Sequence, residues 1–328
     1  MEQSTNKAHI YYSIKEFQER TNPRNIVATL GLFDGVHLGH QHLIKQTMMM
    51  AEELHAESLI ITLDKHPITV LRPDEQPPLK LAPLEEKLRY ISQLGVHHIL
   101  VLPFTLELSR LLPIPFISPI VESGLIGMML GYDNRFGRKM VGETIESFDN
   151  DLKELGLEIR RVSTFELGGI PVSSSRIRFC LAQKNFTQLE ELLGRAFSIT
   201  GKVVGGLQIG RKIDFPTANV LPNDEHVILP EIGVYVSEVL IDGELYTGMS
   251  YYGPRPTIIS GEVIHNRIEV YVFDFNGNLY DKELTVSFRH LIREDIKFDD
   301  LEQLKRQLEE DERVSREFFS NHSILLTK

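Results

Sequence analysis

The segment Gly31-Leu32-Phe33-Asp34-Gly35-Val36-His37-Leu38-Gly39-His40 decides the fold expected for the first half of this chain. It directly follows the apolar run Ile26–Leu30, and the amphipathic stretch Leu38–Leu54 begins inside it. A buried strand that turns over glycines into a helix is typical of α/β proteins, in which the helix start offers free N–H groups to a phosphate. The glycines Gly31, Gly35 and Gly39 allow the backbone to turn tightly and to approach a ligand closely.

His37 and His40 are three residues apart at the start of the predicted helix, so both imidazoles lie on one side of its first turn. There, each can donate a hydrogen bond to phosphate oxygens that gain charge in a transition state. A metal-binding pair is one alternative, but no third ligand is evident. A second alternative is a core histidine whose partner is the backbone. The glycines after an apolar strand favour the phosphate interpretation.

The rest of the first half alternates apolar runs with amphipathic stretches. Besides Ile26–Leu30, the predicted buried strands are Ser58–Leu63, His98–Leu102, Leu125–Leu130 and Leu157–Val162, and Pro83–Leu94 is a second predicted helix. This alternation predicts a doubly wound parallel sheet, Rossmann-like in class, with ligands at the carboxyl ends of its strands.

The second half has closely spaced strands without intervening helices. The predicted strands are Ser198–Val204, Gly233–Ile241, Leu245–Tyr251, Arg267–Phe275 and Glu283–Phe288, with a final helix over Leu301–Phe319. This pattern predicts a small antiparallel barrel or sandwich. We therefore expect two domains, residues 1–184 and residues 185–328.

Composition restricts the partners of the chain. Its 328 residues carry a net charge of −11, which argues against a broad nucleic-acid surface and leaves a local pocket for a small anion. Cys180 is the one cysteine, so a disulfide framework is excluded and a reducing, cytoplasmic location is expected. The longest apolar stretch, Leu111–Leu130, contains three prolines and Glu122, so we expect a buried loop and strand there and no membrane span.

Two further segments of the first half carry phosphate-binding chemistry. The run Ser173–Arg178 begins with three serines that can cap a helix, and Arg176 and Arg178 add charge-assisted donors that a simple cap does not need. His66 precedes Pro67, which forces an extended backbone, so this histidine either reaches a ligand or merely ends a strand.

The decapeptide resembles the signature of the HxGH nucleotidyltransferases and, in this longer form, of prokaryotic FAD synthetases. His66-Pro67, Gly131–Gly137 and Ser173–Arg178 match the same family in the same order. The resemblance implies that His37 and His40 contact the phosphates of ATP, with the segment that holds Arg176 opposite them and Asp133 near the flavin or nucleotide. The binding residues implied are Gly31, Phe33, Asp34, Gly35, Gly39, His66, Asp133, Ser174, Ser175 and Arg178. Lys65 and Asn134 depart from the family, which usually has proline and phenylalanine there.

In the second half, Phe215-Pro216-Thr217-Ala218-Asn219 resembles the motif of riboflavin kinases. That resemblance implies that Thr217 and Asn219 hold Mg-ATP, that Gly210 and Arg211 lie near the nucleotide, and that Glu269 takes a proton from riboflavin. The segment Gly205–Lys212 is not a P-loop, because Arg211 and Lys212 stand where Lys and then Ser or Thr are required. Further matches are Arg255-Pro256-Thr257, Leu279-Tyr280, Ile292–Glu294 and Lys297-Phe298.

Three departures affect the kinase-like half. Asp214 replaces a glycine, Asp281 replaces a second glycine, and Tyr251-Tyr252-Gly253-Pro254 stands where the family usually has Asn-Ile-Gly-Thr. A carboxylate in place of a glycine beside a phosphate loop is expected to hinder the approach of ATP and to repel it.

The resemblance therefore implies an FAD synthetase that transfers AMP from ATP to FMN and releases pyrophosphate, with Mg²⁺ as its cofactor, and that also phosphorylates riboflavin to FMN. Its partners are then small molecules, namely ATP and the flavins riboflavin, FMN and FAD. One alternative is a monofunctional FMN adenylyltransferase with an inactive or regulatory kinase-like domain. Others are a non-catalytic flavin-binding regulator and another nucleotidyltransferase of the same superfamily. The oligomeric state stays open.

Overall fold

The computed structural model describes residues 8–20, 25–138, 142–206, 210–253, 257–259, 262–264 and 267–322. The chain divides into two compact units, Met1–Ser174 and Ser175–Lys328. The predicted boundary after residue 184 stays a prediction, and the structural division comes ten residues earlier, near the start of helix α8 (Ser174–Ala182). Pro254-Arg255-Pro256 and Leu207–Ile209 lie outside the described residues.

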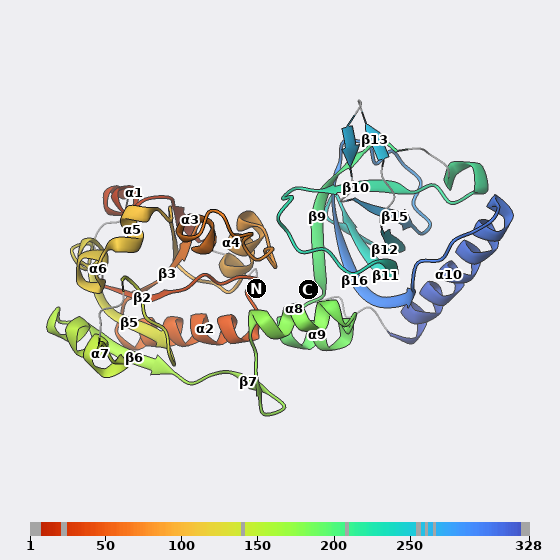
Figure 1. Cartoon of the computed structure of the whole chain (residues 1–328). Coiled ribbons are helices and arrows are strands. Elements are labelled where there is room, and N and C mark those ends of the chain that lie inside the picture. The colour runs from red at the N-terminus through yellow and green to blue at the C-terminus, as the bar shows by residue number, and fades with distance from the viewer. Residues whose placement is uncertain are drawn as a thin grey trace. The chain divides into compact units, whose positions relative to one another are not determined.

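The first unit is built on a six-stranded parallel sheet with strand order β1-β4-β3-β2-β5-β6 (Figure 1). The strands are β1 (His9–Tyr11), β2 (Ile26–Leu30), β3 (Glu57–Leu63), β4 (His98–Leu102), β5 (Leu125–Gly131) and β6 (Glu158–Val162). All five predicted strands are present and shift by at most one residue at either end. The sequence missed β1, because three residues are too few to show a pattern.

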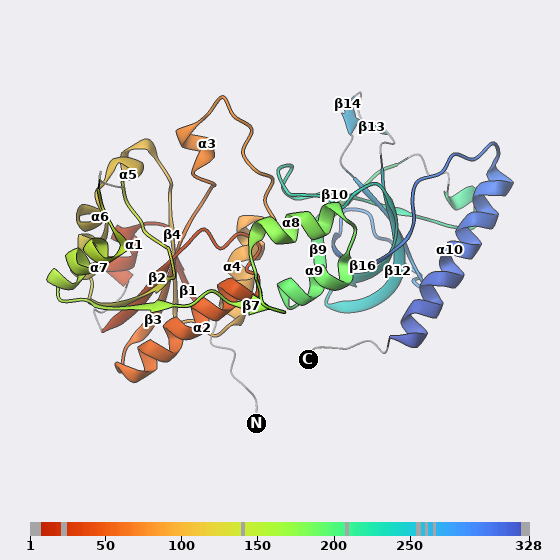
Figure 2. The same ribbon diagram turned by 60° about the horizontal axis from the view of Figure 1, so that its bottom comes forward.

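Helices cover both faces of this sheet, as expected for a doubly wound fold (Figure 2). They are α1 (Ile14–Arg20), α2 (Leu38–Glu53), α3 (Ile68–Leu71), α4 (Leu84–Gln93), α5 (Leu106–Arg110), α6 (Pro113–Val121) and α7 (Ile145–Glu154). Ala28 of β2 packs with Phe17, Phe116 and Phe148 of α1, α6 and α7. Its neighbour Val27 points to the opposite face, toward residues of α2 and α4.

The apolar stretch Leu111–Leu130 differs from the prediction of a loop and strand, because its first part forms helix α6. Pro113 occupies the first turn of α6, where a missing N–H costs nothing, and Pro119 lies inside the helix. Burial of Phe116, Ile117 and Ile120 offsets that defect. Within the described ranges, no helix is long and apolar enough to cross a membrane.

The second unit is a closed antiparallel barrel with strand order β10-β15-β12-β11-β16-β9. Its strands are β9 (Phe197–Val204), β10 (Ala218–Pro222), β11 (Gly233–Ile241), β12 (Glu244–Tyr252), β15 (Ile268–Val272) and β16 (Glu283–Arg293). Of the two predicted architectures, the barrel is the one formed. The sequence missed β10, because its five residues, Ala-Asn-Val-Leu-Pro, show no regular alternation of polar and apolar side chains. The polar Asn219 is itself buried.

The remaining elements are short, apart from the last helix. They are β7 (Glu166–Leu167), β8 (Ile170–Pro171), α9 (Phe186–Leu193), η1 (Gly210–Ile213), β13 (Thr257–Ile259), β14 (Glu262–Ile264) and α10 (Leu301–Asn321). Helix α10 confirms the predicted Leu301–Phe319, and its N-cap is Asp300, whose carboxylate accepts the N–H of Gln303 at 2.8 Å. Its Leu304 and Leu308 pack beside Phe215 and Met249 of the barrel.

Candidate active sites

The two histidines of the decapeptide lie against each other at the start of α2. His37 is the N-cap residue, and its Nδ1 accepts the backbone N–H of His40 at 3.3 Å. The two rings stack with centroids 3.6 Å apart, and the rings of Phe33 and His40 meet in a T-shaped arrangement. A His37 ring that accepts at Nδ1 carries its proton on Nε2, from which it can donate to a phosphate oxygen.

His40 is held in its neutral form. Burial, His37 and Lys87, in that order, hold the pKa of His40 well below its usual range. Its Nδ1 is buried and has no hydrogen-bond partner among the described residues. A neutral imidazole with an unused nitrogen in this position can donate a hydrogen bond to a phosphate oxygen without adding a charge.

The backbone between β2 and α2 takes an uncommon conformation. Phe33, Gly35 and Val36 have φ values of 51°, 76° and 41°, so two side-chain-bearing residues occupy the left-handed region beside one glycine. A Cβ on Gly35 would come within 2.9 Å of Leu81, and a Cβ on Gly39 within 3.1 Å of the Val172 carbonyl oxygen. Gly35 is therefore required by its conformation as well as by close approach, whereas Gly39 is favoured by close approach alone.

Asp34 joins this turn to other parts of the first unit. Its Oδ1 accepts the N–H of Leu81 at 2.9 Å, and its carbonyl accepts the hydroxyl of Ser174 at 3.2 Å. The structure thus brings Ser174 to the decapeptide, while a ligand contact by the Asp34 carboxylate stays a prediction.

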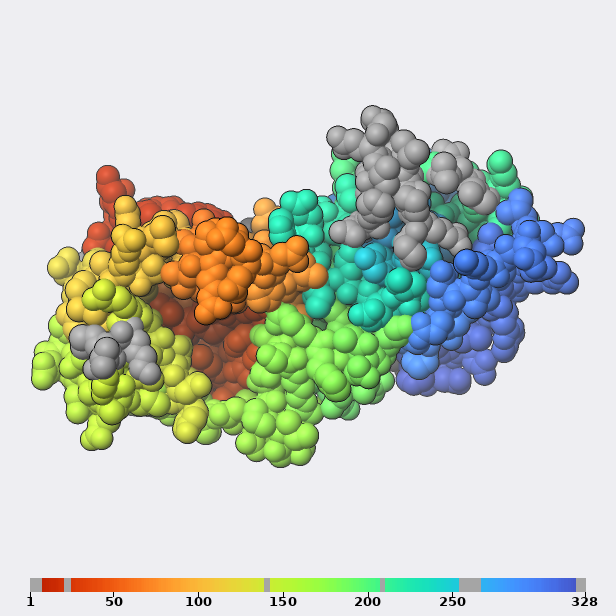
Figure 3. Space-filling model, in the orientation of Figure 1, coloured from red at the N-terminus to blue at the C-terminus, as the bar shows by residue number. Residues whose placement is uncertain are grey.

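In the space-filling view, the segment around residues 65–80 (orange) overhangs a hollow with a red floor in the first unit (Figure 3).

A pocket opens at the carboxyl ends of β2 and β3, where a parallel sheet is expected to bind ligands. It is lined by Leu32, Asp34, Leu63, Asp64, Lys65, His66, Pro78, Lys80, Ala82, Leu84 and Lys87. The Nδ1 of His66 accepts the N–H of Ile68 at 3.2 Å, so this histidine also helps to start α3. The sequence interpretation missed Lys87, because a lysine inside a predicted helix carries no motif.

For the other predicted residues of this half, most of the expected ligand contacts stay predictions. Asp133 is exposed, and its contact with flavin stays a prediction. The amide of Asn134 donates to the carbonyl of Leu30 at 2.6 Å, which gives this departure from the family a structural partner at the end of β2. Ser175, Arg176 and Arg178 belong to the second unit, and their approach to the histidines stays a prediction.

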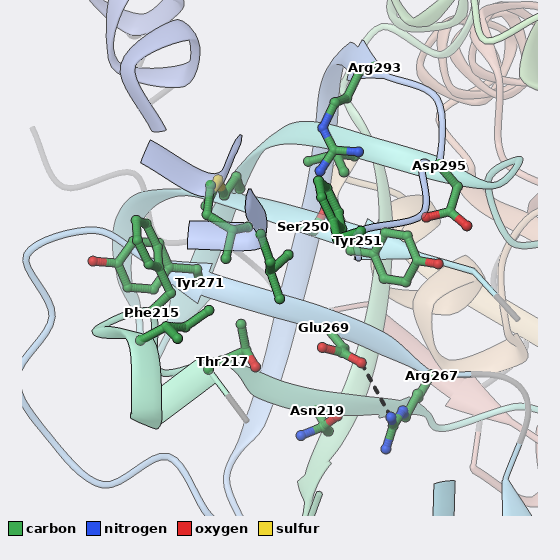
Figure 4. Close-up of a pocket in the computed structure, with 17 residues that line it drawn as sticks. Phe215, Thr217, Asn219, Ser250, Tyr251, Arg267, Glu269, Tyr271, Arg293 and Asp295 are labelled. Carbon is green, nitrogen blue, oxygen red and sulfur yellow. Dashed lines mark hydrogen bonds and ion pairs between the residues drawn. The ribbon is translucent and has the colours of Figure 1, made fainter. Parts of the chain in front are cut away.

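The second unit has a pocket of about 140 Å³ that contains most of its predicted site residues (Figure 4). Gly210, Thr217, Asn219 and Glu269 all line it. Glu269 of β15 lies directly opposite Asn219 of β10 and Tyr251 of β12, so the three side chains share one face of the barrel wall. Arg211 is not among the lining residues, and its guanidinium lies over the Tyr280 ring.

Two arginines of this pocket were missed by the sequence interpretation. Arg267 is only 5% exposed, its Nη2 donates to Glu269 Oε1 at 3.2 Å, and its buried Nη1 has no partner among the described residues. Arg293 forms a two-pronged ion pair with the buried Asp311 of α10, with Nη2 2.9 Å from Oδ2. The signal for Arg267 was its place two residues before Glu269, which puts both side chains on one face of a strand.

The departure at Asp214 does not place a carboxylate in the pocket. Asp214 has φ 68°, a conformation that suits the usual glycine, and it is not a lining residue. Its carboxylate is exposed and accepts a hydrogen bond from Lys305 at 2.6 Å, which offsets its charge. Asp281 likewise has φ 63° and pairs with Lys202 at 3.1 Å. The expected obstruction at Asp214 is therefore not seen.

The residues of this pocket suit Mg-ATP chemically. Thr217, Asn219 and Glu269 offer hydroxyl, amide and carboxylate oxygens, which are the ligands that Mg²⁺ prefers in company with phosphate. No cluster of three or more His, Cys, Asp or Glu side chains that could hold a metal alone occurs within the described ranges.

Comparison with known proteins matches each half to a flavin enzyme. Residues 19–176 match the family model of FAD synthetase, and residues 193–319 match that of riboflavin kinase. The bifunctional riboflavin kinase/FMN adenylyltransferase of Escherichia coli K12 is 35% identical over 89% of this chain and 92% of its own. The chain belongs to this family. The enzymes of the same name from Pseudomonas fluorescens and Bacillus subtilis are 36% and 33% identical over 90% and 95% of the chain.

A solved structure supports the two-domain architecture. The crystal structure of a Streptococcus pneumoniae protein described as a macrolide-efflux protein is 28% identical, with a TM-score of 0.78 over 94% of this chain and 98% of its own. The chain thus carries both the nucleotidyltransferase domain and the kinase domain that the sequence predicted.

Proposed function

We propose that the first unit transfers AMP from ATP to FMN and that the second unit phosphorylates riboflavin to FMN. One observation carries this proposal: each unit assembles its own set of phosphate-handling side chains. These are His37 and His40 at the start of α2, and Asn219 opposite Glu269 with Thr217 in the barrel pocket. Efflux, named for the pneumococcal structure, is not proposed, because both family models describe flavin enzymes.

In the first unit, a phosphate oxygen of FMN attacks the α-phosphorus of ATP, and the bond from that phosphorus to the leaving pyrophosphate breaks. No proton has to move in this exchange. His37 and the neutral His40 donate hydrogen bonds to phosphate oxygens as their charge increases, next to the N–H groups at the start of α2. The protein acts mainly by holding the two phosphates in line.

In the second unit, Glu269 takes the proton of the terminal ribityl hydroxyl, whose oxygen bonds to the γ-phosphorus of ATP while ADP leaves. Arg267 orients this carboxylate through its 3.2 Å hydrogen bond. Mg²⁺, held through Thr217 and Asn219 with the ATP phosphates, would neutralise charge on the transferred group. The cofactor Mg²⁺ and a cytoplasmic location are part of this proposal.

The test is to supply the pure full chain with riboflavin or FMN, together with ATP and Mg²⁺, and to measure FMN and FAD. We expect FAD from either flavin. His40→Ala should abolish FAD formation and leave FMN formation from riboflavin intact. Glu269→Gln should lower FMN formation from riboflavin by about 100-fold or more and leave FAD formation from FMN intact.

Each alternative has its own outcome in this assay. FAD from FMN without any product from riboflavin would contradict the kinase assignment and leave a monofunctional adenylyltransferase. No product from either flavin would point to a non-catalytic flavin-binding protein. A different phosphomonoester that replaces FMN at a higher rate would identify another nucleotidyltransferase.

A further inference from the structure

Lys87 of α4 is buried at the edge of the first site, with a residue exposure of 6%. Its ammonium donates three hydrogen bonds, to the carbonyl of Leu32 at 3.1 Å, the hydroxyl of Thr62 at 3.0 Å and the carbonyl of Leu63 at 2.9 Å. All three of its N–H groups are therefore used. The acceptors lie at or just beyond the carboxyl ends of β2 and β3, beside the pocket described above.

The acceptor that matters most is the carbonyl of Leu32, which directly precedes the left-handed turn of Phe33 and Val36. The hydroxyl of Thr62 also donates to this carbonyl, at 3.2 Å, so Lys87 and Thr62 hold the same oxygen together. A non-glycine residue in a sparsely populated conformation costs about 1–3 kcal/mol and persists only where its surroundings enforce it. The Lys87 ammonium is one of the two groups that these hydrogen bonds place on the carbonyl at the start of this turn.

The charge of Lys87 works against the stability of the fold. Burial lowers the pKa of Lys87 to about 8, although the carboxylates of Asp34 and Asp64 oppose this effect. A methionine would fill a similar volume without a desolvated charge. A side chain that costs stability at the edge of a site indicates a role in function.

We infer that Lys87 is a positioning residue for adenylyl transfer: it holds the Leu32 carbonyl so that the following turn presents His37 and His40 to the nucleotide phosphates. The inference rests on the function proposed above for the first unit. It requires no contact between Lys87 and either substrate.

The test compares Lys87→Met with Lys45→Met, a matched control at an exposed position of α2. We expect Lys87→Met to lower kcat for FAD formation by about 10- to 100-fold, as for a small misplacement of reacting groups, with a smaller change in KM. FMN formation from riboflavin should be unchanged, and the midpoint of thermal unfolding should be equal or higher. Lys45→Met should match the wild type in every measurement.

The pH profile separates this role from simple packing. Besides Asp34 and Asp64, the charged groups that face Lys87 are Lys80, which lowers its pKa, and His40, whose pKa Lys87 lowers in turn. Above pH 8 the Lys87 amine becomes neutral and loses one donor, so kcat of the wild type for FAD formation should decline there. The profile of Lys87→Met should lack this decline.

The sign for stability is opposite. The unfolded chain keeps the Lys87 proton up to about pH 10.5, whereas the folded chain loses it at about pH 8. Between these values the unfolded state binds more protons, so this lysine makes the free energy of unfolding rise with pH. The difference between wild type and Lys87→Met should show that rise.

Thr62→Val tests the inference without altering Lys87, and we expect it to lower FAD formation by less than Lys87→Met does. Where Lys87→Met folds, the double variant should lose less than the product of the two single losses, since both side chains hold one carbonyl. Losses of FAD formation that multiply in the double variant would contradict the inference. So would a rate of FAD formation by Lys87→Met within twofold of the wild type, or a lower rate that is accompanied by a lower midpoint of thermal unfolding. A wild type that makes no FAD would instead overturn the proposed function.

Discussion

Arg267 is a buried side chain of the second pocket that does not use all of its hydrogen-bond donors within the described part of the chain. One of its terminal nitrogens bonds Glu269, while the other is buried without a partner in the described part of the chain. A buried guanidinium N–H without an acceptor costs about 1–3 kcal/mol, which a phosphate oxygen of ATP would recover.

Arg267→Met should therefore lower kcat/KM for riboflavin phosphorylation by about 100-fold or more. Steady-state kinetics with riboflavin and ATP measure this loss. Arg267→Lys, with a charge but no fork, should recover part of the rate, and a kcat/KM of Arg267→Met within twofold of the wild type would contradict this role.

Four aspartates of the second unit occupy a backbone conformation that favours glycine, and each forms an ion pair that offsets its charge. Asp214, Asp242, Asp274 and Asp281 all have positive φ values, a conformation that glycine adopts without strain and aspartate adopts more readily than most residues. Each is paired with a lysine or arginine, namely Lys305, Lys282, Arg316 and Lys202 in the same order. Such exposed pairs add little stability, but they offset the negative charge that replaces glycine at positions 214 and 281.

At the scale of elements, a buried ion pair joins α10 to the end of β16. Arg293 at the end of β16 forms an ion pair with Asp311, which is 1% exposed. The Nε2 of Gln307 donates to Oδ1 of the same carboxylate at 2.9 Å. Removing the negative partner leaves a charged guanidinium among Phe298 and the pocket walls.

Asp311→Asn should lower the free energy of unfolding of the second unit by about 3 kcal/mol, because it breaks a buried pair and leaves the cation behind. Urea unfolding, followed through riboflavin phosphorylation and the tyrosine signal, measures this loss. Asp274→Asn, which removes an exposed pair with Arg316, is the control and should cost less than about 1 kcal/mol. Equal losses from both variants would show that burial of the pair is unimportant.

At the scale of the whole molecule, the two sets of site residues rest on separate cores. The parallel sheet carries His37 and His40, whereas the barrel carries Asn219 and Glu269. Because each compact unit assembles its own set, a defect in one site should leave the other site active.

An equimolar mixture of the His40→Ala and Glu269→Gln proteins should therefore make FAD from riboflavin, although His40→Ala alone makes none and Glu269→Gln alone makes it about 100-fold more slowly than the wild type. The first supplies FMN, which the second converts after the FMN has diffused through solution. A time course by liquid chromatography should show FMN before FAD. A mixture that accumulates FMN without FAD would contradict this separation of the two sites.

The sequence by itself determined the features that depend on neighbouring residues. The strand–turn–helix around His37 and His40, five strands of the sheet, an antiparallel second domain and its last helix follow from local periodicity, glycines and caps. Local signals did not locate Thr217, Asn219 and Glu269; the family resemblance supplied both these residues and their roles.

Only the tertiary structure decided which distant residues meet. Asn219 lies opposite Glu269 because of strand register, Lys87 reaches Leu32 because α4 packs on the sheet, and Lys305 meets Asp214 because α10 lies on the barrel. Register and packing are set by the burial of whole faces, so no stretch of neighbouring residues encodes these contacts. The decapeptide thus specified its own turn, while the side chain that we infer to hold that turn in place comes from a helix more than fifty positions later in the chain.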